Sequence, residues 1–284
     1  MAIGSWLALP YATFNSPDRL HLMTPSPRQD ASPHQPVPAG PVALITGAGS
    51  GIGRAVALML AREGYRLILV GRNLHKLERV ALEVIAAAPS PPPIKHDLLA
   101  IPLAADLADA AACEFVINKG VAVAGRLDVL INNAGWSPLT PIPEMAPATA
   151  RRIFEVNALA PVALTLAACR QFAQQAPLPH RPPCIVNVSS LASTDPFVGL
   201  GVYGAAKAAV NLLTLATARE CPGVRAFAVA PGAVETDLLR SIVPTDILPP
   251  ERCLRPEDVA RVILDCVLGA YDQQNGRTIE VPSP

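Results

Sequence analysis

Short apolar runs alternate with amphipathic segments from residue 42 to the C-terminal end of the chain. Continuous runs rich in Val, Ile and Leu predict buried strands, and apolar residues spaced by three and four predict helices. In the segment 54–63, Val56, Met59 and Leu60 share one face and Gly64 ends the helix. This pattern predicts strands at 42–46, 66–70, 101–104, 128–132, 184–189, 225–229 and 278–281, and helices at 54–63, 74–88, 108–123, 148–174, 203–220 and 256–268.

The order of these elements predicts the fold class. Continuously apolar strands that alternate with helices are typical of a parallel sheet covered on both faces. We therefore expect one α/β domain with a doubly wound parallel sheet of about seven strands. Pro102 interrupts the third strand, and because proline removes a ladder donor, this strand is expected at an edge of the sheet.

Proline separates the first part of the chain from this domain. The chain has 284 residues and 31 prolines, and eight of them precede residue 42. The segment 23–40 has almost nothing to bury, which predicts a disordered tail over 1–40 and a domain over 41–284. A mitochondrial targeting segment is the alternative for the tail, although Asp18 and Asp30 offset Arg19 and Arg28.

Charge and cysteine content exclude other classes of protein. Lys plus Arg equals Asp plus Glu, at 23 each, so the basic excess of a nucleic-acid-binding protein is missing. No uninterrupted apolar run approaches the roughly 18 residues of a membrane span, so no membrane partner is expected. The six cysteines form no metal-ligand or disulfide spacing, which predicts reduced thiols, no metal site and a cytoplasmic location.

The first strand runs into a glycine-rich turn, Thr46-Gly47-Ala48-Gly49-Ser50-Gly51-Ile52-Gly53, and then into a helix. The amino terminus of a helix offers free N–H groups and a positive dipole end to an anion. Glycines let the backbone turn sharply and approach a pyrophosphate closely. This strand–turn–helix context predicts dinucleotide binding.

Further motifs follow at the ends of later strands. Asn132-Asn133-Ala134-Gly135 closes the fourth strand, Asn157 lies on the next helix, and Pro231-Gly232-Ala233-Val234-Glu235-Thr236 closes the sixth strand. Tyr203 and Lys207 are four residues apart and therefore share a helical face. Ser190 precedes Tyr203 by 13 residues.

These motifs together resemble the short-chain dehydrogenase/reductase family over residues 42–281, which implies a Rossmann-type fold. The resemblance implies that Ser190, Tyr203, Lys207 and Asn157 are catalytic, with Ser190 favoured over Ser189 by the spacing. It also implies a cofactor site made of Gly47, Ser50, Gly51, Ile52, Gly53, Arg72, Asn73, Asp106, Leu107, Asn133, Ala134, Gly135, Tyr203, Lys207, Pro231, Gly232, Val234 and Thr236.

These residue types suit the reduction of a ketone or aldehyde. Tyrosine has a pKa near 10, and the Lys207 ammonium is expected to lower the pKa of Tyr203 so that it serves as general acid. The Ser190 hydroxyl would bind the developing alkoxide. The alternatives are alcohol oxidation by the same residues, or a redox-inactive NADP-binding protein on the same scaffold.

The second strand ends in Gly71-Arg72-Asn73, without the acid that usually binds the ribose of NAD. A guanidinium pairs well with a phosphate, so Arg72 favours NADP(H). The alternative is that Arg72 is a solvated loop residue with no role in cofactor choice. Asp106 matches the adenine-contacting aspartate of the family, but a simple helix N-cap would give the same pattern.

The segment 235–254 is the expected substrate lid. Its leucines, isoleucines and valine indicate a substrate with a hydrophobic part, although ordinary loop packing would leave the same pattern. Two departures from the family stand out: Gly204 where many members have serine, and a C-terminus ending Val281-Pro282-Ser283-Pro284 instead of V-D-G-G. We expect a homodimer or homotetramer, and the altered C-terminus puts a simple tetramer in doubt.

Overall fold

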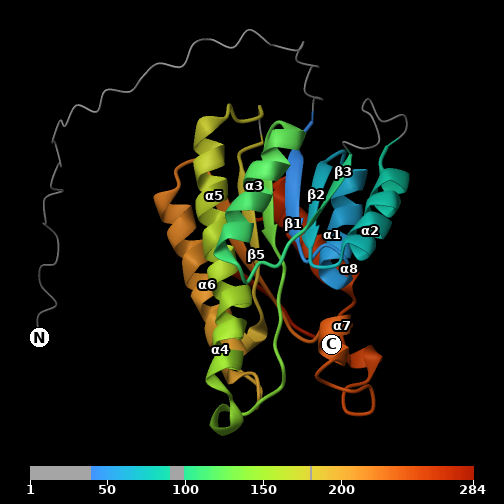
Figure 1. Cartoon of the computed structure of the whole chain (residues 1–284), viewed down its shortest axis with the longest axis vertical. Coiled ribbons are helices and arrows are strands. Elements are labelled where there is room, and N and C mark those ends of the chain that lie inside the picture. The colour runs from blue at the N-terminus through green and yellow to red at the C-terminus, as the bar shows by residue number, and fades with distance from the viewer. Residues whose placement is uncertain (1–39, 90–98, 180) are drawn as a thin grey trace, which may run out of the picture. The chain divides into compact units, whose positions relative to one another are not determined.

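The computed structural model describes residues 40–89, 99–179 and 181–284. The expected tail 1–40, except for Gly40, lies outside the described residues. Figure 1 shows one central sheet flanked by helices. The strands are β1 (Val42–Thr46), β2 (Arg66–Gly71), β3 (Ala100–Ala104), β4 (Val129–Asn132), β5 (Cys184–Val188), β6 (Arg225–Pro231) and β7 (Thr278–Val281). The helices are α1 (Gly51–Arg62), α2 (Leu74–Ala87), α3 (Ala110–Ala124), α4 (Pro147–Phe154), α5 (Ala160–Gln174), α6 (Gly201–Glu220), α7 (Asp237–Arg240) and α8 (Pro256–Leu268).

All seven strands are parallel, in the order β3-β2-β1-β4-β5-β6-β7. The predicted doubly wound α/β sheet is therefore confirmed, and β3 lies at an edge as Pro102 indicated. The chain order reverses between β1 and β4, which have β2 and β5 as their outer neighbours. At such a reversal the carboxyl ends of the two strands leave a crevice in which dinucleotides bind.

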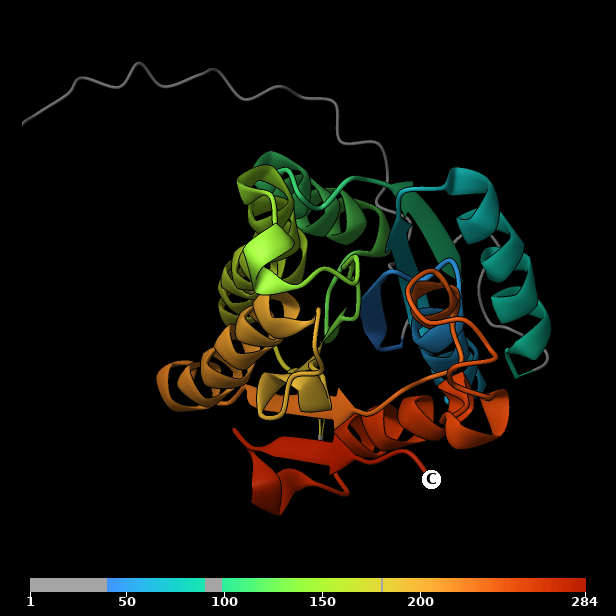
Figure 2. The same ribbon diagram turned by 90° about the horizontal axis from the view of Figure 1, so that it is seen from below.

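Two hydrophobic layers hold the sheet between helices, as Figure 2 shows from below. Side chains alternate across a strand, so in β1 Ala43 and Ile45 pack toward α1, α2 and α8, whereas Val42 and Leu44 pack toward α3 and α5. Because both faces of the sheet are covered, the strands are apolar throughout. This explains why the strands occur in the sequence as continuous apolar runs and not as alternating apolar and polar residues.

A single long helix carries one of the predicted catalytic residues. Its segments α4 and α5 are joined by the π-helical turn η3 (Glu155–Leu159). The continuous helix Pro147–Gln174 is long and apolar enough, by length and composition, to cross a membrane, with a mean hydropathy of 1.4 and 44% of its most apolar window buried. Leu164, Ala168 and Phe172 bury one face of this helix in the core. Polar residues interrupt the apolar sequence of this helix, so it contains no uninterrupted apolar run of the length that a membrane span needs.

Candidate active site

A cavity of about 1640 Å³ opens at the carboxyl ends of the strands. The predicted residues that line it are Gly47, Ser50, Gly51, Ile52, Arg72, Asn73, Asp106, Leu107, Asn133, Ala134, Gly135, Ser190, Tyr203, Lys207, Pro231, Gly232, Val234 and Thr236. Two predicted residues, Gly53 and Asn157, do not line it. The structure thus brings together motifs that lie as far apart in the chain as Gly47 and Thr236.

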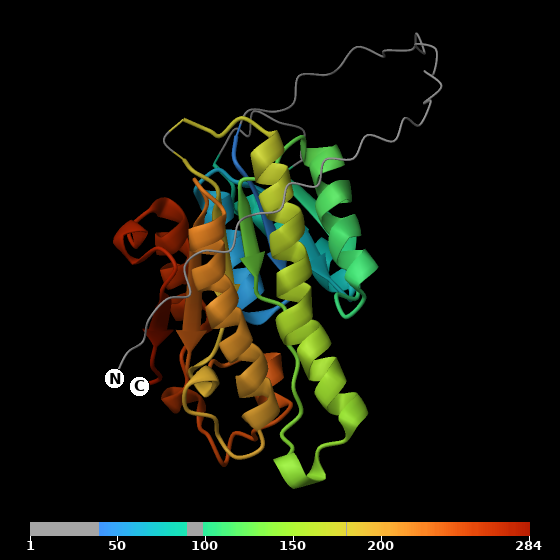
Figure 3. The ribbon, with the colours of Figure 1, turned by 90° about the vertical axis from the view of Figure 1, so that its left-hand side faces the viewer.

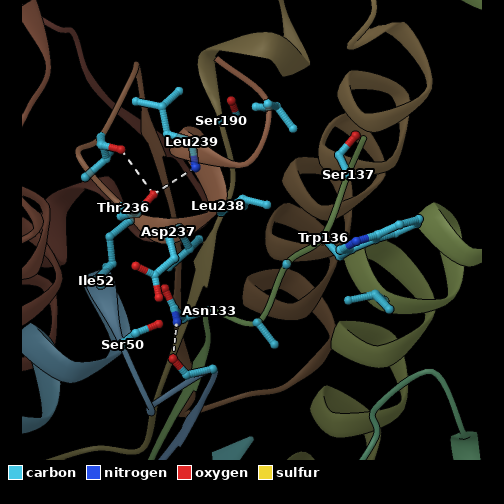
Figure 4. Close-up of a pocket in the computed structure, with 18 of the residues that line it drawn as sticks. Ser50, Ile52, Asn133, Trp136, Ser137, Ser190, Thr236, Asp237, Leu238 and Leu239 are labelled. Atoms are coloured by element: carbon cyan, nitrogen blue, oxygen red, sulfur yellow. Dashed lines mark hydrogen bonds between the residues drawn. The ribbon is translucent and has the colours of Figure 1, made fainter. Parts of the chain in front are cut away.

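The glycine turn is anchored to the end of β4 by side-chain hydrogen bonds. The hydroxyl oxygen of Thr46 accepts from the backbone N–H groups of Asn133 and Ala134, at 2.9 and 3.0 Å. The Asn133 amide donates to the carbonyl oxygens of Thr46 and Gly47, at 2.9 and 3.3 Å. Figure 4 shows Asn133 beside Ser50 at one side of the cavity. The N-N-A-G motif therefore fixes the turn at the reversal between β1 and β4.

Gly53 lies in the first turn of α1, where it packs against the glycine-rich turn. A Cβ atom at this position would lie 2.3 Å from the carbonyl oxygen of Gly47 and 2.6 Å from the Asn133 amide nitrogen. Only glycine lets α1 begin this close to the turn, so that its first N–H groups point toward the cavity. This close approach is what a pyrophosphate site needs. The residues present therefore fit a dinucleotide.

Asp106, the predicted adenine-contacting residue, lines one end of the cavity together with Arg152. The Arg152 guanidinium donates to the Asp106 carboxylate at 2.7 Å, and this hydrogen bond lowers the pKa of Asp106. The N-cap of α3 is Asp109, whose side chain accepts from the Ala111 N–H. The N-cap alternative for Asp106 is therefore wrong. The sequence analysis did not assign Arg152 to this site, because the contact joins residues 46 apart.

Arg72 and Asn73 follow β2 at the same end. Arg72 is exposed at the cavity rim, and its charge also contributes to the lowered pKa of Asp106. Asn73 caps α2, with its side-chain oxygen accepting from the Lys76 N–H at 3.1 Å. His75 and Lys76 line the cavity from the first turn of α2. Cationic and polar groups thus surround the position where the ribose of a dinucleotide would be recognised.

The predicted catalytic residues meet near the middle of the cavity. Tyr203 and Lys207 come from the first turns of α6, and Ser190 follows β5. The Ser190 hydroxyl oxygen accepts from the Ala192 N–H at 3.1 Å, whereas Ser189 donates to the Lys207 carbonyl oxygen at 3.3 Å. The Lys207 ammonium donates to the Val188 carbonyl oxygen at 2.8 Å and lies 5.6 Å from the centre of the Tyr203 ring. Both serines line the cavity, and Ser190 stays the predicted catalytic serine.

The pKa values of Tyr203 and Lys207 differ from the sequence-based expectation. Burial raises the pKa of Tyr203 to about 12, and the hydrogen bond with Ser190 offsets only part of this increase. Burial also lowers the pKa of Lys207 to about 8. The expectation that Lys207 lowers the pKa of Tyr203 is therefore not met in this structure, because loss of solvent dominates both groups. Tyr203 holds its proton throughout the neutral range.

Asn157 lies in the π-helical turn and is fully buried. Its amide nitrogen donates to the carbonyl oxygens of Trp136 and Ile153, at 2.6 and 2.8 Å, and its oxygen accepts from the Trp136 N–H at 3.2 Å. A Cβ atom on Gly135 would be 3.1 Å from that oxygen and 3.9 Å from the Lys207 nitrogen. Asn157 thus holds the segment after N-N-A-G beside Lys207. No spacing in the sequence indicated the π turn.

Position 204 is a glycine where many members of the family have serine, and the structure gives a steric reason. A Cβ atom there would lie 2.2 Å from the carbonyl oxygen of Ala192, in the short helix η4 (Leu191–Ser193). Glycine therefore lets the segment after Ser190 pack directly on α6. A serine at this position would push that segment away from Tyr203.

The altered C-terminus also contacts the site. The Gly232 N–H donates to the Val281 carbonyl oxygen at 2.9 Å, and the Ser283 hydroxyl donates to the Ala233 carbonyl oxygen at 3.2 Å. The Thr236 hydroxyl donates to the Val234 carbonyl oxygen and accepts from the Leu239 N–H, which caps α7 (Figure 4). The end of the chain thus braces the Pro231–Thr236 turn.

The substrate side of the cavity is apolar. Trp136 and Ser137 lie across the cavity from Leu238 and Leu239 in Figure 4, with Ser190 near the lid. Phe197 and Val198 are 72% and 86% exposed at the rim. The lid itself contributes Leu238, Leu239, Ile242, Val243, Ile247 and Leu248. Apolar side chains from the lid and the rim therefore line this side of the cavity.

Comparison with known proteins identifies the family. Residues 41–246 match the family model for short chain dehydrogenases. The chain is 34% identical over 247 residues to "Granaticin polyketide synthase putative ketoacyl reductase 2" of Streptomyces violaceoruber, covering 82% of this chain and 92% of that protein. It is 30% identical over 249 residues to an uncharacterised oxidoreductase of Mycobacterium tuberculosis, covering 84% and 90%.

A solved structure supports the same assignment. The 3-ketoacyl-(acyl-carrier-protein) reductase from Brucella melitensis, complexed with NADH, has a TM-score of 0.74 and 28% identity, covering 85% of this chain and 96% of that one. The fold, the cavity and these similarities agree. The chain therefore belongs to the short-chain dehydrogenase/reductase family, whose members are oxidoreductases that use a nicotinamide cofactor.

Proposed function

We propose that the protein is an NADPH-dependent reductase that converts a ketone or aldehyde with a hydrophobic part into the corresponding alcohol. The observation that carries this proposal is the meeting of Ser190, Tyr203 and Lys207 in one cavity wall, between the glycine turn and the apolar lid. When bound, the reduced nicotinamide supplies the hydride.

The residues of the chain would supply the rest of the chemistry. Ser190 and Tyr203 together offer two hydroxyl donors to one carbonyl oxygen, which stabilises negative charge as it develops there. Tyr203 then transfers its phenolic proton to that oxygen. The raised pKa keeps Tyr203 protonated near neutral pH, as a proton donor must be before the reaction begins.

Tyr203→Phe tests the proposal. The ring and its packing stay, but the proton donor is lost, so we expect NADPH oxidation with the best carbonyl substrate to fall at least ~100-fold. NADPH affinity, measured by fluorescence titration, should change less than about threefold. Tyr271→Phe, which alters a tyrosine that does not line the cavity, is the matched control. Near-normal reduction by Tyr203→Phe would refute the assignment and favour a redox-inactive role for the scaffold.

The preference for NADPH rests on the charge at the adenine end. Of the described residues that line the cavity, the acids are Asp106 and Asp237, and they are paired with Arg152 and Lys76, respectively. No acid follows β2 to repel a ribose 2′-phosphate, whereas Arg72 is exposed there. The relative from Brucella melitensis was solved with NADH, so the preference of this chain must be measured directly.

Steady-state kinetics with both cofactors will measure it. We expect kcat/KM for NADPH to exceed that for NADH at least tenfold, and Arg72→Ala to remove most of that difference by raising the KM for NADPH alone. Arg79→Ala changes an exposed arginine of the following helix, α2, that does not line the cavity, and should leave the ratio intact. Equal use of both cofactors by the unchanged protein would contradict the NADP assignment.

We further propose that the protein is a cytoplasmic homodimer or homotetramer. Its six cysteines are free, which suits a reducing compartment; a mitochondrial location is the alternative. Leu159 and Leu166 on the long helix, and Leu212 on α6, are large exposed apolar side chains that a second copy would cover. Sedimentation equilibrium of the full chain tests the assembly, and a monomer at micromolar concentration would contradict it.

A further inference from the structure

Two of the six cysteines face each other outside the cavity. Cys113, Cys184, Cys253 and Cys266 are buried, whereas Cys169 and Cys221 are half-buried. Their sulfur atoms are 3.1 Å apart, which is about 1 Å longer than a covalent disulfide bond. Neither thiol lines the cavity or takes part in the proposed reaction.

The pair connects the two helices that carry catalytic residues. Cys169 lies on α5, in the same continuous helix as Asn157, and Cys221 ends α6, which begins with Tyr203 and Lys207. Figure 3 shows α5 and α6 side by side. Lys207 and Cys221 are 14 positions apart along α6, a distance of about 21 Å at ~1.5 Å per residue. The thiols are therefore remote from the active site.

The backbone at Cys221 can adapt to a covalent link. Cys221 is the C-cap of α6, with non-helical angles of φ −110° and ψ 84°, and Pro222 and Gly223 follow it. A Cβ atom on Gly223 would meet no atom within 4 Å, so the turn has open space beside it. A small shift of this turn would bring the sulfurs to bonding distance without disturbing the regular part of either helix.

We propose that Cys169 and Cys221 are an oxidisable dithiol, which peroxide converts into an intramolecular disulfide that staples α5 to α6. In the first step the Cys221 sulfur attacks one oxygen of hydrogen peroxide, the O–O bond breaks, and a sulfenic acid and water form. In the second step the Cys169 sulfur attacks the Cys221 sulfur, the S–O bond breaks, and a second water leaves. Two thiols and one peroxide thus give one disulfide and two waters.

Cys221 takes the first step because it lies at the end of α6 beside the open turn at Gly223, whereas Cys169 lies within α5. Burial and the hydrogen bond with Cys221 raise the pKa of Cys169 to about 12, which agrees with this order. A thiol reductant in the cytoplasm reverses the reaction by thiol–disulfide exchange.

The expected consequence is stability rather than a change in catalysis. The link joins residues 52 apart and restricts the unfolded chain. For a domain of this size, a typical disulfide corresponds to a rise in Tm of about 5–10 °C. Turnover should stay within about twofold, because the thiols already touch and lie far from Tyr203.

The experiment treats the full chain with hydrogen peroxide, blocks remaining thiols with N-ethylmaleimide, and maps its peptides without reduction. We expect a linked peptide pair containing Cys169 and Cys221, lighter than the two separate peptides by two hydrogen atoms, and a rise in Tm that dithiothreitol reverses. Cys169→Ala and Cys221→Ala should each lose both effects. Cys266→Ala, at a buried cysteine on α8, should keep them.

Three results would overturn the proposal. The first is complete alkylation of both thiols after peroxide treatment. The second is a disulfide between two chains, seen as a dimer on a non-reducing gel that is lost in Cys221→Ala. The third is the linked peptide with an unchanged Tm, which would remove the stabilising role.

Discussion

The two halves of the cavity are built in different ways. The cofactor half is made from strand ends and helix starts, where Thr46, Asn133 and Gly53 are held by backbone atoms of the sheet. The substrate half is made from the lid 235–254, whose apolar side chains are mostly half-buried, and from the exposed rim residues Phe197 and Val198. The first half is rigid because the fold itself holds it, and the second half depends on contacts within one loop.

One arginine makes four of the side-chain hydrogen bonds within this loop. The Arg240 guanidinium pairs with both carboxylate oxygens of Glu235. It also donates to the carbonyl oxygens of Val243 and Leu248, at 3.2 and 2.8 Å. Glu235 lies next to Thr236 in the cofactor-closing turn. Arg240 therefore fixes the shape of the lid and ties it to the cofactor half, which makes the comparison testable.

The largest effect is expected from Gly53→Ala in the cofactor half. Its Cβ would collide with the Gly47 carbonyl oxygen, a backbone atom that cannot move without displacing the turn. We expect NADPH affinity to fall more than about 100-fold, since the turn must move away from its phosphate-binding position. Isothermal titration calorimetry measures this.

Gly64→Ala is the control for that experiment. It also replaces a glycine at an end of α1, but its Cβ would meet no atom within 4 Å. It should cost some stability because Gly64 has φ +79°, yet leave NADPH affinity unchanged. Equal affinities for the Gly53 and Gly64 variants would show that the cofactor half tolerates change as the lid does.

A second prediction uses the burial of Lys207, which belongs to the rigid half. Its pKa is lowered from 10.5 to about 8, so below pH 8 the folded protein carries the full cost of a buried ammonium. Between pH 8 and 10.5 the unfolded chain binds more protons than the folded one, so the free energy of unfolding should rise with pH. The gain relative to Lys207→Met should total about 3 kcal/mol, at ~1.4 kcal/mol per unit of pKa.

Urea denaturation of both proteins from pH 7 to 11 checks this difference. Tyr203 has a raised pKa and opposes the trend above pH 10, but it is present in both proteins and cancels in the comparison. A constant difference across this range would mean that Lys207 is solvated and that the rigid half is more open than its burial indicates.

The same contrast explains what could be predicted from the sequence. Seven strands and the cofactor motifs were recognisable because each depends on local pattern: an apolar run, a glycine turn, a fixed spacing between Ser190 and Tyr203. The contacts of Arg152 with Asp106 and of Ser283 with Ala233 were not, since they join segments distant in the chain. The π turn at Asn157 and the tight packing of Gly204 likewise arise from tertiary contacts that leave no periodic trace.

Individual residues also show where pattern is ambiguous. Asp106 and Asp109 lie three residues apart before α3, and either could cap it by sequence. The helix begins one residue after Asp109, and this leaves Asp106 at the cavity. For Tyr203, the spacing to Lys207 located the pair but not the degree of burial, which reverses the expected direction of its pKa.

The smallest effect is expected from Arg240→Lys in the lid. Lysine keeps the charge but cannot pair with both Glu235 oxygens while also reaching the Val243 and Leu248 carbonyl oxygens, because an ammonium lacks the planar fork of donors. The apolar side chains between those carbonyls should then lose their fixed positions. Since the site is partly exposed, we expect a rise of only about tenfold in KM for the carbonyl substrate. Because Arg240 does not line the cavity, kcat should stay within about threefold and NADPH affinity within about twofold.

Arg261→Lys, at an exposed arginine of α8, is the matched control. If NADPH affinity fell in parallel with the rise in KM, the lid and the cofactor turn would be one mechanical unit, and the division of the cavity into a rigid and a loop-dependent half would have to be abandoned.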